Sequence, residues 1–186
     1  SEAADPIAAL RALSAEKVLA TSKAVMFGAG AVTYPPGNTF GPVVDGWVLP
    51  DDVQTIFDEG KQNLVPLIAG AAADEFTLFI PKSPFDSVEA YQGFLKKIFG
   101  KYTEDILAKY PAKEPGEILK SLCDYVGDIQ FVTGARRFVR AMEKAGGKAY
   151  LCLFTMTFPA PMAALGAYHG CLLYTSPSPR DRTRSR

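Results

Sequence analysis

The stretch that decides the fold is NLVPLIAGAAADEFTLF, residues 63–79. Its apolar run, Leu64–Ala69, is bounded by polar residues and glycine, which is the pattern of a strand buried in a sheet. An acidic pair, Asp74 and Glu75, follows this run within a few positions. The stretch therefore predicts a buried strand with Glu75 just beyond its carboxyl end.

A second buried strand is predicted for KAYLCLF, Lys148–Phe154, which is rich in β-forming apolar residues. Between the two strands, apolar residues recur at helical spacing, which predicts helices after Asp86 or Ser87 and over residues 102–110, 117–126 and 134–145. Strands joined through several helices run parallel, so the fold class is α/β. Two strands are too few for a complete doubly wound sheet, so we expect part of the domain to be absent.

Upstream of the first strand the sequence predicts short local elements. Asp5-Pro6 is typical of a helix start, and Ser14 indicates a second start soon after it. Residues 26–38 are rich in Gly and Pro and are predicted as loop, and FGAGAV within them lacks the spacing of a nucleotide-binding loop. Asp45-Gly46 predicts a turn, and Asp51 or Asp52 predicts the cap of a short helix through Phe57 that Gly60 closes.

The composition excludes several broad classes of function. Hydrophobic residues make up 48% of the chain and charged residues 22%, and the formal net charge is zero, so no overall basic field points to nucleic acid. No apolar run approaches the roughly 18 residues of a membrane-spanning helix. The three cysteines have no metal-site spacing, and Cys123 and Cys152 are predicted to be core thiols. The chain shows no targeting signal but begins at Ser1 without a Met, so the compartment is left open.

The predicted chemistry lies where the two strands end. In open α/β sheets ligands bind outside the carboxyl ends of the strands. Glu75 follows the first strand, and His169, the single histidine, follows the second. A carboxylate that orients an imidazole, and an imidazole that accepts a proton, form two thirds of an acyl-transfer triad, and acid before histidine is the order of α/β-hydrolases. The alternatives are a solvated loop residue or helix cap for Glu75 and a structural role for His169.

The nucleophile of such a triad is not found in this sequence. No G-x-S-x-G occurs, and the serines upstream of His169 lack the flanking glycines of a strained strand-to-helix turn. Other polar and aromatic candidates have simpler interpretations. Asp45 serves its turn, Asp128 caps a helix or pairs with an arginine, and three aromatic residues either line a pocket or belong to the core: Trp47, Phe76 and Phe79.

Four stretches in order resemble the type-B carboxylesterases, the cholinesterase-like branch of the α/β-hydrolase fold. FGPVVDGWVLP (40–50) resembles the F-x-P-V-x-D-G-x-x-L-P segment of that family, and PLIAGAAADEF (66–76) is similar to the strand and loop of its catalytic acid. GDIQF (127–131), Arg136 or Arg137 and GGKAYLCLF (146–154) are similar to its helix, arginine region and Tyr-x-Tyr-x-Phe strand. LGAYHG (165–170) resembles its catalytic-histidine loop.

The resemblance implies an incomplete α/β-hydrolase fold: the C-terminal strands of a mainly parallel sheet with flanking helices. It assigns Glu75 as the triad acid and His169 as the general base, with a small-molecule carboxylic ester as substrate and with no metal or organic cofactor. The serine and the oxyanion hole are expected upstream of Ser1, so this chain alone is predicted to be inactive. The alternative is a non-catalytic, cholinesterase-like adhesion or binding protein. The oligomeric state is left open. If the triad assignment is right, Glu75 and His169 should lie within hydrogen-bond reach, beyond two parallel strands.

The end of the chain departs from this pattern. Residues 171–186 read CLLYTSPSPRDRTRSR, where the family continues with an acidic residue and an apolar stretch. The string resembles a translated transposon-end adapter from sequencing-library preparation. We therefore divide the chain into residues 1–170, a C-terminal piece of a carboxylesterase domain, and 171–186, a non-native tail expected to be extended or badly packed with Arg180–Arg186 exposed. The biological alternative is an RNA-contacting tail.

Overall fold

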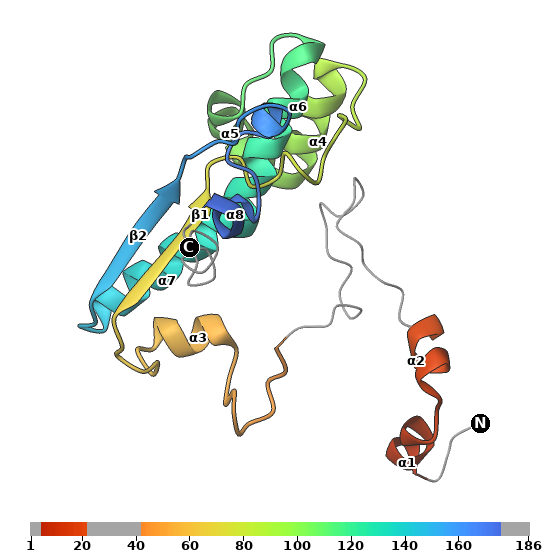
Figure 1. The fold of residues 1–186 in the computed structure, drawn as a ribbon, viewed down its shortest axis with the longest axis vertical. Helices are drawn as coiled ribbons and strands as arrows, with labels where there is room; N and C mark the ends of the chain where they lie inside the picture. The colour runs from red at the N-terminus through yellow and green to blue at the C-terminus, as the bar shows by residue number, and fades with distance from the viewer. Residues whose placement is uncertain (1–4, 22–41, 176–186) are drawn as a thin grey trace, which may run out of the picture. The chain divides into compact units, whose positions relative to one another are not determined.

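The two predicted strands form a parallel sheet in the computed structural model, which describes residues 5–21 and 42–175. Strand β1 (Leu67–Ala72) pairs with β2 (Ala149–Phe154), in register from Leu67 opposite Ala149 to Ala72 opposite Phe154 (Figure 1). The strand boundary predicted from the sequence is wrong by three residues, because the ladder starts after Pro66, whose nitrogen cannot donate to it. Gly70 is required here, since a Cβ at this position would clash with the carbonyl oxygen and Sγ of Cys152.

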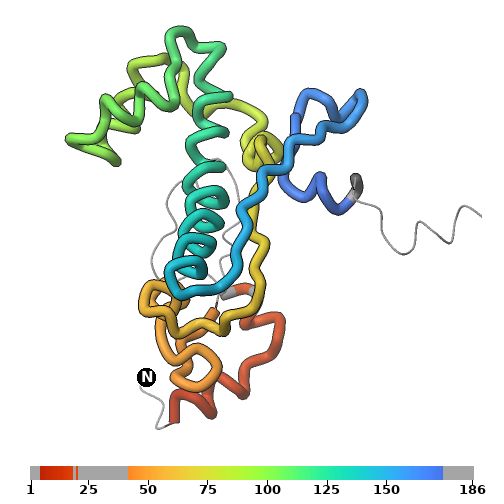
Figure 2. The backbone as a smooth tube through the Cα atoms, turned by 90° about the vertical axis from the view of Figure 1, so that its left-hand side faces the viewer, coloured from red at the N-terminus to blue at the C-terminus, as the bar shows by residue number. Residues whose placement is uncertain are grey.

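The prediction that both strands are buried is also wrong. Ile68 on β1 is 73% exposed, and its register partner Tyr150 on β2 is 59% exposed. The helix α7 (Thr133–Lys144) runs along both strands and covers one side of the sheet, as Figures 1 and 2 show. Within the described residues the other side has no such cover. Cys152, predicted as a core thiol, is exposed for the same reason.

The helices that follow β1 up to residue 127 gather into a bundle that we call the helical lobe, residues 88–127. It consists of α4 (Val88–Phe99), η1 (Gly100–Tyr102), α5 (Thr103–Lys109) and α6 (Pro115–Gly127). Ser87 caps α4, as predicted, by accepting a hydrogen bond from the Ala90 backbone N–H at 3.2 Å. The centre of the lobe is fully buried and apolar, and its members with less than 2% exposure are Tyr91, Leu95, Ile118 and Leu122.

The helical lobe connects to the sheet through one continuous helical run (Figure 2). At the end of α6 the backbone widens into a single π-helical stretch, Asp128–Val132, labelled η2, and continues directly as α7. The sequence predicted two separate helices here. The π-helical residues lie beside the end of β1, and this placement brings Phe131 to the site described below.

The predicted upstream elements are present where the structure describes them. Residues 1–43 form a separate unit, in which Asp5 caps α1 (Pro6–Arg11) and is followed by α2 (Ala15–Thr21). The loop predicted for residues 26–38 lies outside the described residues. In the second unit Asp52 caps α3 (Val53–Asp58), and Phe57 packs its ring against Phe138 of α7 at 4.6 Å between centroids.

Two sequence interpretations in this region have clear outcomes. Asp45 Oδ1 accepts hydrogen bonds from three backbone N–H groups, those of residues 47, 48 and 49, so Asp45 serves its turn as predicted. Trp47 is 90% exposed, so it belongs to neither a core nor a closed pocket in the described structure. No described helix has the length and apolar character that crossing a membrane requires.

After β2 the chain returns to the sheet end through a loop and a short helix, η3 (Met162–Leu165). Asp74 and Tyr168 then form an isolated parallel bridge that extends the β1 side of the sheet. The chain continues as α8 (Cys171–Thr175), whose Cys171 is fully buried while Leu172 and Leu173 are 49% and 80% exposed. The start of the tail is therefore helical rather than extended, and it buries Cys171 while its two leucines are exposed. Residues 176–186, with Arg180–Arg186, lie outside the described residues.

Candidate active site

Glu75 and His169 meet at the carboxyl ends of β1 and β2. The His169 Nδ1 atom lies 2.6 Å from Glu75 Oε2, although the two residues are 94 positions apart in the sequence. The side chain of Glu75 is 8% exposed and that of His169 is 44% exposed. The geometric prediction made from the sequence is confirmed: the strands are parallel and the two side chains are hydrogen-bonded. Their catalytic roles stay a prediction.

Glu75 is held by its own strand. Its Oε1 atom accepts a hydrogen bond from the backbone N–H of Ala72, the last residue of β1, at 2.7 Å. Both carboxylate oxygens are therefore engaged, one by the backbone and one by the imidazole. A carboxylate oxygen accepts hydrogen bonds, so this contact favours the tautomer of His169 in which Nδ1 carries the proton. This interpretation replaces the alternative of Glu75 as a solvated loop residue.

The imidazole ring contacts two phenylalanine rings. The Phe131 ring centroid lies 4.9 Å and the Phe79 ring centroid 5.4 Å from that of His169. With Nδ1 bound to Glu75, Nε2 is the nitrogen through which the partly exposed ring can exchange a proton with another molecule. Of the aromatic residues singled out in the sequence, Phe76 is core, at 6% exposure, and Phe79 contacts the candidate base.

Sequence reasoning missed Phe131 as a neighbour of the site. Its position depends on the π-helical stretch between α6 and α7, and no local pattern in GDIQF predicts a π-helix. The same turn brings Gly127 against the Cβ of Glu75, at a distance where an added methyl would make ordinary van der Waals contact. The base and the acid are thus packed against one helical run that the sequence divides in two.

The serines of the described residues are occupied elsewhere. Each hydroxyl takes part in a helix cap, a turn or a bond to a nearby carbonyl, and the pairs are Ser14 with Lys17, Ser83 with Phe85, Ser87 with Ala90 and Ser121 with Pro111. None of these bonds involves His169. Among the described serines, the structure thus places no nucleophile on the imidazole.

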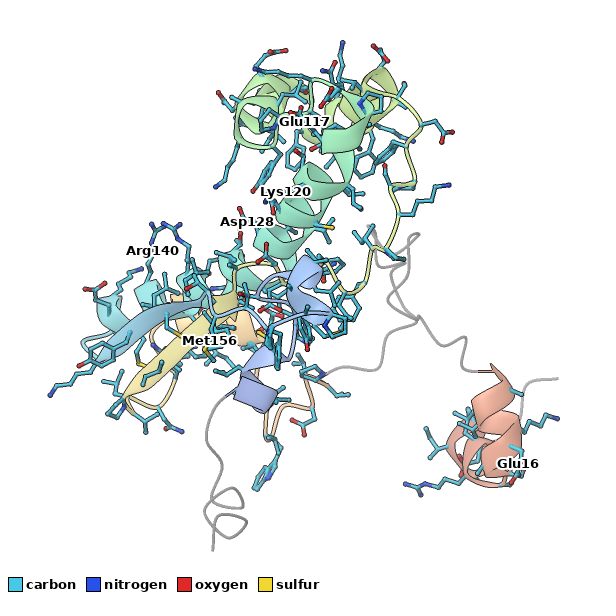
Figure 3. All side chains as sticks on the ribbon, turned by 45° about the horizontal axis from the view of Figure 1, so that its top comes forward. Glu16, Glu117, Lys120, Asp128, Arg140 and Met156 are labelled. Carbon is cyan, nitrogen blue, oxygen red and sulfur yellow. The ribbon has the colours of Figure 1, made fainter. Side chains whose placement is uncertain are left out.

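A cleft of about 320 Å³ lies behind Glu75, against α6. Lys120 and Asp128, labelled in Figure 3, contribute to its wall. Asp128 accepts a hydrogen bond from the Tyr110 hydroxyl at 2.7 Å and lies 3.7 Å from Lys109 Nζ, so the arginine partner or cap predicted for it is wrong. Burial raises the pKa of the Cys123 thiol in this wall to about 11, so the thiol stays protonated at neutral pH, as expected of a core cysteine.

Comparison with known proteins adds independent evidence. A sequence model of the carboxylesterase family matches residues 1–175. The fumonisin B1 esterase of Sphingopyxis macrogoltabida is 29% identical over 104 residues, which cover 56% of this chain and 19% of that protein. Lipase 2 of Diutina rugosa is 29% identical over 190 positions, which cover 90% of this chain and 33% of that protein. The chain thus spans a third or less of the length of these curated relatives.

Proposed function

Because the chain belongs to the carboxylesterase family, we propose that it is the part of a serine carboxylic-ester hydrolase that carries the acid and the base of a Ser-Glu-His triad. The observation that carries this proposal is the 2.6 Å pair of His169 Nδ1 and Glu75 Oε2 beyond two parallel strands. The same pair favours a hydrolase over a cholinesterase-like adhesion protein, since binding requires neither group.

The proposed chemistry follows from the two ring nitrogens. Glu75 holds the Nδ1 proton, so Nε2 presents its lone pair and accepts the proton of a serine hydroxyl as that oxygen attacks the ester carbonyl. The protonated ring then donates the same proton to the departing alcohol oxygen, which leaves an acyl-serine. A water molecule, deprotonated by Nε2 in turn, hydrolyses this intermediate and releases the carboxylic acid. Throughout, the Glu75 carboxylate stabilises the positive charge of the imidazolium.

We place the serine and the oxyanion-hole N–H groups upstream of Ser1 in a longer protein, with residues 1–170 as its C-terminal piece and 171–186 as non-native. The occupied serine hydroxyls support this assignment. An esterase and a lipase among the relatives support a carboxylic ester as the substrate. The proposal uses no metal or organic cofactor.

The first experiment compares this chain with a version extended by its own upstream coding sequence. The chain alone should hydrolyse a short-chain nitrophenyl ester no faster than a denatured sample, because a triad acts as a unit. The extended protein should show a G-x-S-x-G and turn the ester over. Gly or Ala at the nucleophile position would instead favour the adhesion protein, and rapid serine-type turnover by the chain alone would refute the assignment of the nucleophile.

In the active, extended protein His169→Ala should lower kcat by about 10³-fold or more, because the general base is lost. Glu75→Gln should lower kcat by a similar or smaller factor, since the amide no longer stabilises the imidazolium. Glu104→Gln makes the same chemical change at an exposed position of α5 and should leave kcat unchanged. Unimpaired turnover by His169→Ala would end the hydrolase role of this residue.

A further inference from the structure

The residue next to the candidate acid makes a second long-range contact. The Asp74 carboxylate accepts a hydrogen bond at its Oδ2 atom from the backbone N–H of Ala167, at 2.9 Å and across 93 positions. The backbones of the same two residues are also joined, because the Asp74 N–H donates to the Ala167 carbonyl oxygen at 3.0 Å. Ala167 precedes His169 by two residues. Asp74 therefore binds the backbone of the loop that carries His169, while Glu75 binds the imidazole ring of His169.

We propose that Asp74 is a positioning residue, whose carboxylate fixes the turn at Gly166 and Ala167 and thereby sets the distance between His169 and Glu75. This inference rests on the proposed function, in which Glu75 orients the imidazole of the base and the neighbouring Asp74 positions the loop that carries it. Asp74 does not reach the reacting atoms, and it acts through the loop it binds. Because small displacements of a catalytic group lower rates steeply, a second anchor on the base is physically useful.

Gly166 shows how tightly the carboxylate is seated. Its φ of +65° lies in the left-handed region, and a Cβ built there would collide with the Oδ2 atom and the Cγ atom of Asp74. The turn thus approaches the carboxylate more closely than any other residue type permits. An alanine at this position would displace Asp74, so the contact can be broken from either loop.

The surroundings of the contact are rigid. Ala167 and Tyr168 are buried, at 1% and 7% exposure, in an apolar cluster against Ala72 and Phe154. The Thr77 hydroxyl oxygen lies 2.6 Å from the Leu165 carbonyl oxygen and 2.9 Å from that of Asp74, which ties the two loops a second time. A hydrogen bond on a fixed frame transmits its geometry to the neighbouring residue, which here is His169.

The test uses the single histidine of the chain as its own reporter. In the 186-residue protein labelled with ¹⁵N-histidine, every imidazole signal belongs to His169. A short bond from Nδ1–H to a buried carboxylate gives a strongly downfield proton that exchanges slowly with water. Its chemical shift and exchange rate are measured in the wild type, in Asp74→Ala, which lacks the acceptor, and in Asp74→Asn, whose amide oxygen can still accept. Two matched controls are Asp105→Ala, an exposed carboxylate of α5, and Gly93→Ala, a helical glycine with open space around it.

We expect Nδ1 proton exchange to be about tenfold to hundredfold faster in Asp74→Ala and in Gly166→Ala, the range for losing a hydrogen bond to a charged group. Asp74→Asn and the two controls should stay close to the wild type. Wild-type exchange in Asp74→Ala would overturn the proposal, and so would equal loss in Asp74→Asn, since charge rather than the acceptor would then be responsible. If Asp74→Ala does not fold, Gly166→Ala tests the same contact from the other loop. The readout involves no ester, so an absence of hydrolase activity would leave it interpretable.

Discussion

The helical lobe and the two-stranded sheet differ in how much of their apolar surface is buried. In the lobe, Leu95 and Leu122 are 0% and 1% exposed, and Tyr125 is surrounded by the rings of Phe94, Phe99 and Tyr110 at centroid distances of 5.7 to 6.3 Å. In the sheet, side chains just as apolar lie open, with Leu151 and Leu153 at 49% and 61% exposure. The lobe has a core of its own, whereas the sheet shares one cover, α7.

The best-packed region of the molecule, the helical lobe, is therefore not the region that carries the candidate active site. Glu75 and His169 sit at the end of the poorly covered sheet, yet they are connected to the lobe through α6, the π-helical residues and α7. Loops on a rigid scaffold are the usual place for reactive groups. In this chain the well-packed element is the helical run, and the acid loop and the histidine loop are additionally joined to each other by Asp74.

The largest effect on stability is expected from Leu122→Ala in the lobe. This side chain is fully buried on α6, and truncating it removes apolar contacts and leaves a cavity, which costs about 2–5 kcal/mol of unfolding free energy. Urea unfolding followed by far-ultraviolet circular dichroism measures the loss. A cost below about 1 kcal/mol would mean that the lobe is not the cooperative core of the described structure.

A smaller effect is expected from Tyr110→Phe, which removes the hydroxyl that donates to Asp128 at 2.7 Å. The variant should lose about 1–2 kcal/mol at neutral pH, the range for a partly exposed hydrogen bond to a charged group. Tyr102→Phe, at a tyrosine that is 56% exposed, is the matched control and should be neutral.

The Tyr110 contribution should also depend on pH. Burial, together with the hydrogen bond to Asp128, raises the pKa of Tyr110 well above its ordinary value of 10. Because the folded protein keeps the proton longer than the unfolded chain, the stabilisation is complete below about pH 10 and is lost as pH rises from there through the folded-state pKa. The stability difference between wild type and Tyr110→Phe should therefore shrink above pH 10. A difference that grows there would contradict the assigned hydrogen bond.

The sequence predicted those features that depend on neighbours in the chain. The caps at Asp5, Asp52 and Ser87 were identifiable because an N-cap acts within three residues. The strands and their parallel order followed from apolar runs separated by helices, and the residue pair Glu75 and His169 followed from their places after those runs. These inferences need no knowledge of which distant residues meet.

The features that escaped prediction depend on residues brought together from far apart. The exposure of Cys152 and Ile68 depends on which elements pack against the sheet. An apolar run in the sequence is the same whether or not another element covers that side of the sheet. Phe131 and Asp74 reach the site through a π-helical turn and a contact across 93 positions, neither of which has a local signature. Gly166 is distinguishable from other loop glycines only once Asp74 is placed beside it.

The smallest effect is expected from Leu153→Ala, the same substitution as in the lobe but placed on β2. Because this side chain is 61% exposed, truncation removes little buried surface, and the cost should be about 0.5–1 kcal/mol, mostly from lower strand propensity. Its urea midpoint, measured beside that of Leu122→Ala, gives the contrast between the two regions directly. A loss above about 2 kcal/mol would mean that the Leu153 side chain is covered in solution. Repeating the measurement over a hundredfold range of protein concentration would then show whether a second copy provides that cover, since only a stability shared between chains rises with concentration.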